Sequence, residues 1–182
     1  MAIANFDGRL SPEFVEHICT EELIDIILPA GFFNQKAAYL KAVTEWFKQY
    51  NYSVEAVVGL LNIATTDEPW GLIDLRNELL AVKGIGRETA DSILLYALNL
   101  PTFVIDAYTI RLLTRLGFDV PKKYDVVKAM FEDNLPHEVE LFNNYHACIV
   151  INAKEYCRVK PVCEGCPLAE MCQHSLLQGL NS

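Results

Sequence analysis

Apolar residues recur along most of the chain at the 3.6-residue spacing of an α-helix, and Gly or Pro stands at the joints between the helical stretches. Ser11-Pro12 and Thr20 are residue types that begin helices, and Pro29 with Gly31 ends the second of these helices. We predict further helices, with a loop at 64–71, over residues 34–50, 53–63, 71–81, 87–99, 107–116, 124–134 and 138–154.

The pattern predicts an all-α protein with short connections. The one strand-like stretch, residues 103–105, is too short to make a sheet, and no segment repeats at a period typical of solenoids. From Tyr156 onward the chain becomes rich in Cys, Pro and Gly. We expect this end to form a small separate module that is held together by something other than apolar burial.

The composition is that of an ordinary globular protein, because 52% of the 182 residues are apolar and 21% are charged. The apolar run 93–98 is far too short to span a membrane. No leader of charged and then apolar residues opens the chain, so we expect a cytoplasmic protein without a membrane partner. Without an export signal, six cysteines favour metal or redox chemistry over disulfides.

The net charge of −9 counts against binding to nucleic acid by charge alone, because such binding rests on neutralising phosphates with Lys and Arg. A local basic patch and backbone amides can still hold a phosphate on an acidic protein. The charge therefore disfavours a nucleic-acid partner without excluding it.

Four cysteines close to the C-terminus are spaced C-x5-C-x2-C-x5-C: Cys157, Cys163, Cys166 and Cys172. Thiolates this close together on a loop can surround one metal centre. Zinc and a [4Fe–4S] cluster both fit, and the spacing alone does not separate them; cysteines without any metal are the remaining alternative. The other two, Cys19 and Cys148, lie on apolar faces of predicted helices, where we expect small core residues.

A tight turn with two glycines joins two predicted helices at Lys83-Gly84-Ile85-Gly86-Arg87. Glycine adopts positive φ readily and has no side chain, so backbone amides can approach a ligand closely here. These amides lie at the N-terminus of the next helix, where the helix dipole also favours an anion. The turn therefore predicts a phosphate-binding site, with an ordinary helical corner as the alternative.

Asp106 follows the apolar stretch 103–105 and precedes a predicted helix. Its simplest role is an N-cap. A carboxylate at a helix N-terminus is also held rigidly and kept ionised by the dipole. Such an anion suits a reaction that develops positive charge, such as the cleavage of a glycosidic C–N bond through an oxocarbenium-like state.

Taken in this order, the features resemble those of the helix-hairpin-helix, Gly/Pro-rich-loop-Asp family of DNA glycosylases, and endonuclease III in particular. The resemblance runs from about Phe6 to His174. It rests on the terminal cysteines, on the hairpin 82–90, on Pro101-Thr102-Phe103-Val104-Ile105-Asp106 and on Gly31-Phe32-Phe33-Asn34-Gln35-Lys36-Ala37.

The resemblance implies a base-excision repair glycosylase with a two-domain all-α fold. A helical-barrel domain would span residues 27–135, and an iron–sulfur cluster domain would combine residues 1–26 with 136–182. Double-stranded DNA with a damaged base would be the partner, and the damaged nucleotide would be flipped out of the stack. Asp106 would be the catalytic carboxylate, the four clustered cysteines would hold a [4Fe–4S] cluster, and the DNA backbone would bind to Lys83, Gly84, Ile85, Gly86 and Arg87.

One departure from the family concerns Glu88. Members that also cleave the strand have at this position a lysine that forms a Schiff base with the sugar. A carboxylate cannot form an imine, so we expect a monofunctional enzyme that hydrolyses the bond with water. A glutamate here resembles the 3-methyladenine glycosylase branch, which suggests an alkylated purine as the substrate; a surface glutamate without a role in the pocket is the alternative.

Two further departures affect the ends of the chain. The family usually has one more residue between the first two cluster cysteines. Its members also carry additional N-terminal helices, one of which supplies a glutamine-bearing segment that fills the space left by the flipped base. Residues 1–6 resemble the end of a helix entered midway, so we expect those helices to be missing and the activity of this chain to be affected.

Other functions stay open at this point. A degenerate member of the family would bind DNA without catalysis. A small electron carrier would use the cluster but would leave the hairpin without a purpose. A zinc-stapled helical interaction protein would need neither the hairpin nor Asp106. No motif predicts an oligomeric state.

Overall fold

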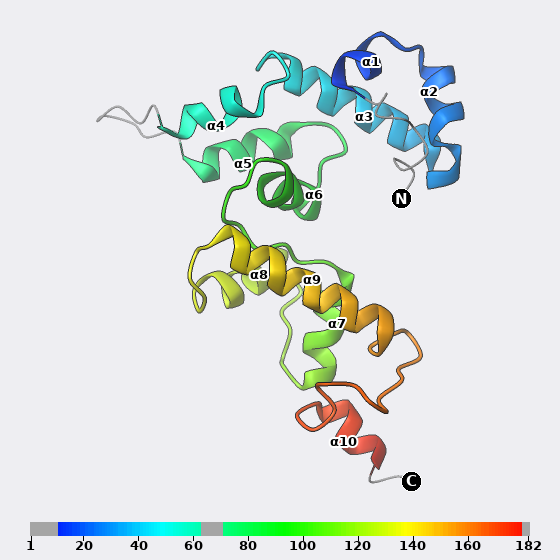
Figure 1. Ribbon diagram of the computed structural model, residues 1–182, viewed down its shortest axis with the longest axis vertical. Helices are drawn as coiled ribbons and strands as arrows, with labels where there is room; N and C mark the ends of the chain where they lie inside the picture. The colour runs from blue at the N-terminus through cyan, green and yellow to red at the C-terminus, as the bar shows by residue number, and fades with distance from the viewer. Residues whose placement is uncertain (1–10, 63–70, 180–182) are drawn as a thin grey trace. The chain divides into compact units, whose positions relative to one another are not determined.

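A computed structural model describes residues 11–62 and 71–179 of the chain, and Figure 1 shows the order of their elements. Every regular element in these ranges is helical, which confirms the predicted all-α class. No helix in the described ranges is long and apolar enough to cross a membrane. The chain divides into two compact units, Met1–Ala90 and Asp91–Ser182, and each is described by itself.

The first unit contains α1 (Pro12–His17), α2 (Thr20–Ile27), the 3-10 turn η2 (Leu28–Ala30), α3 (Phe33–Lys48), α4 (Val54–Asn62), α5 (Leu72–Ala81) and the start of α6 (Arg87–Ser92). The predicted end of the fourth helix at residue 63 and most of the predicted loop 64–71 lie outside the described residues.

Helix α3 organises the first unit, because α1 and α2 both pack against it. Ser11 caps α1 by accepting a hydrogen bond from the Phe14 amide at 3.2 Å, as its residue type predicts. Lys41 of α3 donates to carbonyl oxygens at the C-terminal end of α1, including that of Val15 at 2.6 Å. A positive charge is favourable at this end of a helix, so the contact fixes α1 on α3.

Two polar contacts join the end of α3 to α5. The indole N–H of Trp46 donates to Glu78 at 2.7 Å, and the Tyr50 hydroxyl donates to the same carboxylate at 2.6 Å. Trp46 is buried, so its N–H needs a partner that compensates for the loss of water. Glu78 therefore positions α5, the helix that leads into the glycine hairpin.

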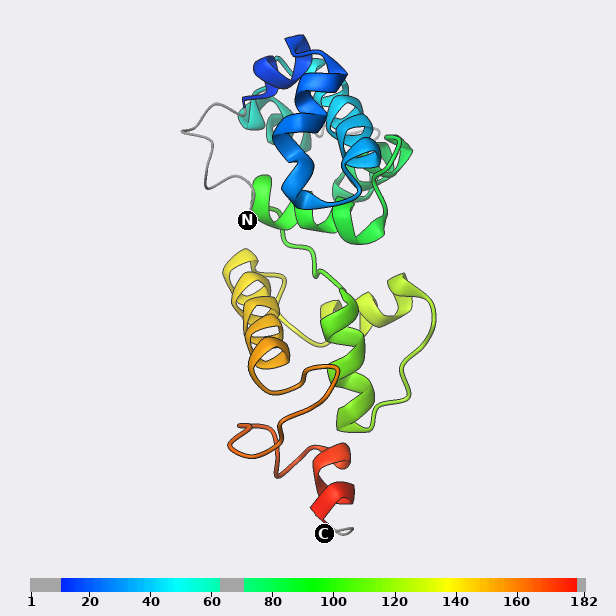
Figure 2. The same cartoon turned by 90° about the vertical axis from the view of Figure 1, so that its right-hand side faces the viewer.

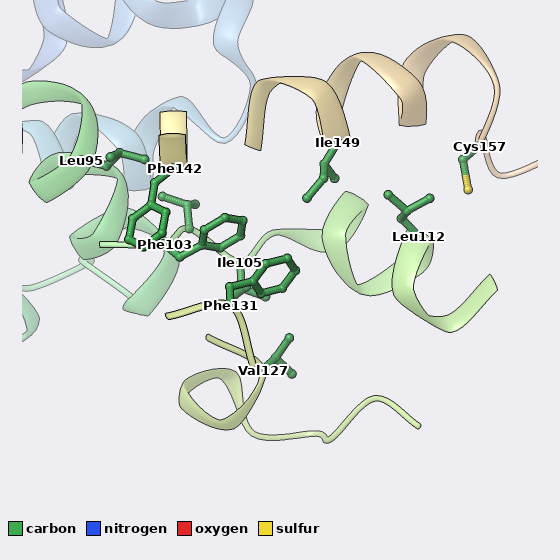
Figure 3. Close-up of a cluster of buried hydrophobic side chains, with 10 residues drawn as sticks. Leu95, Phe103, Ile105, Leu112, Val127, Phe131, Phe142, Ile149 and Cys157 are labelled. Atoms are coloured by element: carbon green, nitrogen blue, oxygen red, sulfur yellow. The ribbon is translucent and has the colours of Figure 1, made fainter. Parts of the chain in front are cut away.

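The second unit contains the end of α6, a π-helical turn η3 (Ile93–Ala97), α7 (Ala107–Leu116), α8 (Tyr124–Glu132), α9 (Val139–Glu155) and α10 (Gln173–Gly179). Helices α7 and α9 lie side by side, as Figures 1 and 2 both show. Aromatic side chains fill the space beside them (Figure 3), where the rings of Phe103 and Phe131 stack with centroids 4.1 Å apart and Phe142 meets Phe103 edge to face.

The strand-like stretch 103–105 forms no strand. Its side chains are almost completely buried, and its backbone is held by other partners. The Phe103 amide donates to Glu132 at 2.8 Å and the Ile105 amide donates to the Tyr124 hydroxyl at 3.2 Å. The apolar run is therefore a core-crossing connection that fixes the position of Asp106 at its end.

The prediction of one continuous helix over 87–99 is wrong. The α-helical pattern ends at Ser92, and η3 follows with wider turns, in which the Leu98 amide donates to the Ile93 carbonyl five residues earlier at 3.0 Å. The insertion of an extra residue into a turn rotates the side chains that follow, and such π-turns occur frequently at functional sites. Tyr96 lies on this turn.

The predicted domains 27–135 and 1–26 with 136–182 stay a prediction, because the two units are not placed relative to each other. Residues 1–6, from which missing helices were inferred, lie outside the described residues.

Candidate functional site

Asp106 is the N-cap of α7, as its residue type predicts. Its Oδ1 atom accepts two hydrogen bonds from Thr109, one from the backbone amide at 2.7 Å and one from the hydroxyl at 2.8 Å. Thr109 is completely buried, and the Asp106 side chain is 12% exposed. The carboxylate is therefore fixed in one orientation, with Oδ2 directed elsewhere.

Oδ2 of Asp106 faces a histidine that the sequence analysis did not single out. The Nε2 atom of His146, on α9, lies 3.5 Å from this oxygen. The other ring nitrogen, Nδ1, shares a hydrogen bond with the hydroxyl of Tyr96 on η3. Three separate elements thus contribute to one chain of contacts, in which Tyr96 touches His146 and His146 faces Asp106.

The surroundings of Asp106 act on its pKa in opposite directions. Partial burial raises the pKa, while His146 and the two hydrogen bonds from Thr109 lower it, and the lowering prevails. Asp106 is therefore an anion at neutral pH. A rigid, largely buried carboxylate of this kind can stabilise a positive charge that develops next to it.

The glycine hairpin lies in the first unit, between α5 and α6. Gly84 has φ = 90° and packs against Tyr39 of α3, so that a Cβ atom here would lie 2.0 Å from the tyrosine ring. Gly86 has open space around it and ordinary φ. Only one of the two glycines, therefore, is required by the fold itself.

The hairpin presents its polar residues outward. Lys83, Gly84, Gly86 and Arg87 are exposed, while Ile85 is 8% exposed and anchors the turn. The Ile85 side chain therefore packs in the interior, and its backbone amide donates to the Val82 carbonyl at 3.1 Å, which closes the turn. The turn before α6 is exposed, and phosphate binding at this turn stays a prediction.

We expect Gly84→Ala to lower the free energy of unfolding by about 3 kcal/mol, because the left-handed backbone and the contact with Tyr39 both oppose a side chain. Gly86→Ala is the matched control and should change stability by about 1 kcal/mol or less. Urea denaturation of both variants measures the difference. Equal stability of the two would contradict the packing described for the hairpin.

Glu88 lies in the first turn of α6 and is exposed. Glu88 belongs to the first unit and Asp106 to the second.

The four clustered cysteines line one small cavity between α7, the end of α9 and the loop that follows. Polar groups are directed at their sulfurs: Arg115 Nη1 lies 3.2 Å from Sγ of Cys157, and Asn152 Nδ2 lies 3.6 Å from Sγ of Cys166. Cys172 Sγ in turn donates to the Arg115 carbonyl at 3.3 Å. The set of four sulfur donors around one cavity fits a metal centre.

The four cysteine side chains are not, however, arranged in a metal-coordinating geometry. In residues 11–62 and 71–179, no group of three or more His, Cys, Asp or Glu side chains is arranged to hold a metal ion.

The expectation of burial for Cys19 and Cys148 is wrong, since both are exposed. Sγ of Cys19 instead caps α2 by accepting a hydrogen bond from the Glu22 amide at 3.4 Å, a role that an apolar periodicity does not reveal.

Relatives of the chain were identified by sequence. Residues 74–96 match the helix-hairpin-helix motif. The chain is 46% identical over 153 residues to a Methanocaldococcus jannaschii protein named as a DNA repair glycosylase, in an alignment that covers 84% of this chain and 66% of that protein. It is 31% identical over 173 residues to endonuclease III of Sulfolobus acidocaldarius, covering 93% and 70%. The chain thus spans about two thirds of the length of these relatives.

Solved structures share the fold. An endonuclease III in a non-covalent complex with DNA matches with a TM-score of 0.72 and 21% identity, covering 96% of this chain and 74% of the other. An H. pylori 3-methyladenine DNA glycosylase bound to 1,N6-ethenoadenine matches with a TM-score of 0.61 and 26% identity, covering 79% and 67%. These similarities confirm the fold that the motifs predict.

Proposed function

The chain belongs to the endonuclease III superfamily of helix-hairpin-helix DNA glycosylases, and from this membership we propose that it removes a damaged base from double-stranded DNA by hydrolysing the N-glycosidic bond. The observation that carries the proposal is the state of Asp106, a fixed and largely buried carboxylate with a lowered pKa. It follows the hairpin in the chain, in the order expected for the family.

In the proposed reaction, Asp106 acts on the sugar of the flipped nucleotide. Loss of the base leaves a positive charge on the sugar ring, and a carboxylate already held in place stabilises this charge without further reorganisation. The base leaves with the electron pair of the C–N bond, a water oxygen bonds to the same sugar carbon, and the proton that this water loses passes to solvent. The Thr109 contacts support this role because they keep Oδ1 from rotating.

The hairpin supports binding to the DNA backbone. Its exposed glycines allow a phosphate to approach the amides, and Lys83 and Arg87 place two positive charges at the turn of an otherwise acidic protein. Phe32 adds an apolar group in the same unit: it is 80% exposed and its backbone is left-handed, with φ = 48°. An exposed aromatic ring held in this way suits insertion between bases.

The finer proposal is that the enzyme is monofunctional. Glu88 occupies the position at which the lyase members of the family have lysine, and a carboxylate forms no imine. We expect Glu88→Lys to form a covalent adduct with damaged DNA that borohydride reduces, whereas the wild-type protein gives only background. Denaturing electrophoresis of the reduced mixture measures the adduct.

Glu88→Gln is the control for this experiment, because it removes the same charge without adding an amine. It should give no adduct. If the wild-type protein were trapped as efficiently as Glu88→Lys, another amine would act as the nucleophile and the enzyme would not be monofunctional.

We further propose an alkylated purine as the substrate. The H. pylori glycosylase that shares the fold is named for 3-methyladenine and was solved with 1,N6-ethenoadenine. A glutamate at position 88 also favours a base with positive charge, which N-alkylation creates.

We propose that Cys157, Cys163, Cys166 and Cys172 hold a [4Fe–4S] cluster, with zinc as the alternative. When bound, either centre ties the loop after α9 to the rest of the second unit through thiolate bonds. Arg115 and Asn152 support the proposal, because they would offset the negative charge of the thiolates. Cytoplasmic localisation stays a proposal as well.

A further inference from the structure

His146 is a buried polar side chain whose position the core does not explain. The residue is 8% exposed, on the helix α9 that also carries the core residues Phe142 and Ile149. Its Nε2 atom makes no hydrogen bond within the described part of the chain and points at Oδ2 of Asp106 from 3.5 Å. An unsatisfied buried nitrogen costs stability, so its retention calls for another reason.

Tyr96 determines where the imidazole proton lies. Partial burial and the negative charge of Asp106 raise the pKa of Tyr96, so its hydroxyl keeps its proton at neutral pH. With a neutral imidazole, this hydroxyl can donate to Nδ1, which places the ring proton on Nε2. The opposite tautomer would direct the Nε2 lone pair at the Asp106 carboxylate, which only accepts hydrogen bonds. With a charged imidazole, Nδ1 donates to the phenol oxygen and Nε2 is again protonated. An N–H group on Nε2 is therefore the arrangement that suits both Tyr96 and Asp106.

We propose that His146 is a positioning residue for Asp106, which it holds by donating from Nε2 to Oδ2, and that Tyr96 fixes the imidazole tautomer that makes this possible. The inference rests on the proposed role of Asp106 as the catalytic carboxylate. Thr109 and His146 then hold one carboxylate oxygen each. The 3.5 Å separation is long for a hydrogen bond, and such contacts tighten when substrate binds.

The groups that act on this carboxylate come from three elements. Tyr96 belongs to η3, His146 to α9 and Thr109 to the helix α7 that Asp106 caps. Arg111, the next charged residue along α7, is directed elsewhere: its Nε donates to the Cys157 carbonyl at 2.8 Å, and its guanidinium lies 5.0 Å from the Tyr108 ring centre. His146 is therefore the side chain that faces Oδ2 of Asp106.

Single-turnover excision from a duplex with one 1,N6-ethenoadenine tests the proposal. His146→Leu should lower the rate by about tenfold to a hundredfold, the effect of losing a hydrogen bond to a charged group, with unchanged DNA affinity. The acid limb of the pH–rate profile should move to higher pH, because Asp106 loses a group that lowers its pKa. His146→Gln keeps an N–H donor and should recover most of the rate.

Two variants that each lose one tyrosine hydroxyl form a matched pair. Tyr96→Phe should slow excision, whereas Tyr145→Phe should not, because Tyr145 precedes His146 on α9 and packs on Phe103 and Phe131 instead. An excision rate and pH profile for His146→Leu equal to those of the wild type would overturn the proposal.

A second measurement does not depend on activity. ¹⁵N NMR of the imidazole, assigned by its loss in His146→Gln, should report the Nε2–H tautomer in the wild type and a mixture of tautomers in Tyr96→Phe. A wild-type protein in which His146 is protonated on Nδ1 and unprotonated on Nε2 would overturn the proposal, even if His146→Leu failed to fold. A wild-type protein that shows the predicted tautomer but excises no base would contradict the proposed function and leave the proton placement supported.

Discussion

Replacement of Asp106 by asparagine is expected to slow base excision roughly 10³-fold, with DNA affinity changed by less than a few-fold. Asparagine has nearly the same shape and is also a good N-cap, so its oxygen can still accept from Thr109 and α7 remains in place. What is lost is the negative charge beside the developing oxocarbenium ion. Single-turnover kinetics and fluorescence anisotropy with the same duplex separate the chemical step from binding.

Asp119→Asn removes a charge from an exposed position in the same unit and serves as the control. If Asp106→Asn loses excision and Asp119→Asn keeps it, the result supports the proposal that the chain is an enzyme with Asp106 as its catalytic carboxylate. Absence of excision in every form, the wild type included, together with normal DNA binding, would instead indicate a non-catalytic member of the family.

The lowered pKa of Asp106 also sets a direction for the pH dependence of stability. A carboxylate whose pKa is lower in the folded state stabilises the fold above its unfolded-state pKa, and this contribution is lost as the pH falls through the folded-state value. Asp106→Asn should therefore unfold with less acid dependence than the wild type does.

Cys166→Ser is expected to have the second large effect, this time on metal content and stability. The anaerobically purified wild-type protein should be brown and contain about four iron atoms per chain, as a [4Fe–4S] centre requires. The variant should lose most of the iron and on the order of 5 kcal/mol of stability, because metal–thiolate bonds contribute directly to folding. Visible absorption, iron analysis and limited proteolysis of the loop 157–172 measure these changes.

Cys148→Ser is the control, because Cys148 is exposed and does not line the cavity of the four cysteines. It should keep its iron. A colourless wild-type protein with one zinc ion would contradict the cluster and favour the zinc alternative. A metal-free protein with the same stability as Cys166→Ser would contradict any metal centre.

Local features of the site could be predicted from the sequence because they depend on neighbouring residues. The cap at Asp106 follows from a polar residue that ends an apolar run and precedes a helix. The positive φ of Gly84 follows from a glycine between two helical patterns. The cysteine spacing likewise places four sulfurs on one short loop, which lines a single cavity.

Features that depend on contacts between distant segments could not be predicted in this way. His146 lies 40 residues after Asp106 in the chain, and a single histidine in an apolar helix gives no sign of its partner. The π-turn that carries Tyr96 continues an ordinary helical pattern, so periodicity predicted an unbroken helix. The exposure of Cys19 shows the same limit, since apolar spacing does not tell which face of a short helix is covered.

The products formed by the wild-type protein test most directly our proposal that this chain is a glycosylase without lyase activity. Duplexes containing 3-methyladenine, 1,N6-ethenoadenine or an oxidised pyrimidine would be incubated with the metal-replete protein, and free base and strand cleavage would be measured separately. We predict release of the alkylated purine and a DNA strand that breaks only after alkali treatment. Strand cleavage without alkali, or no base released from any of the three duplexes, would contradict the account.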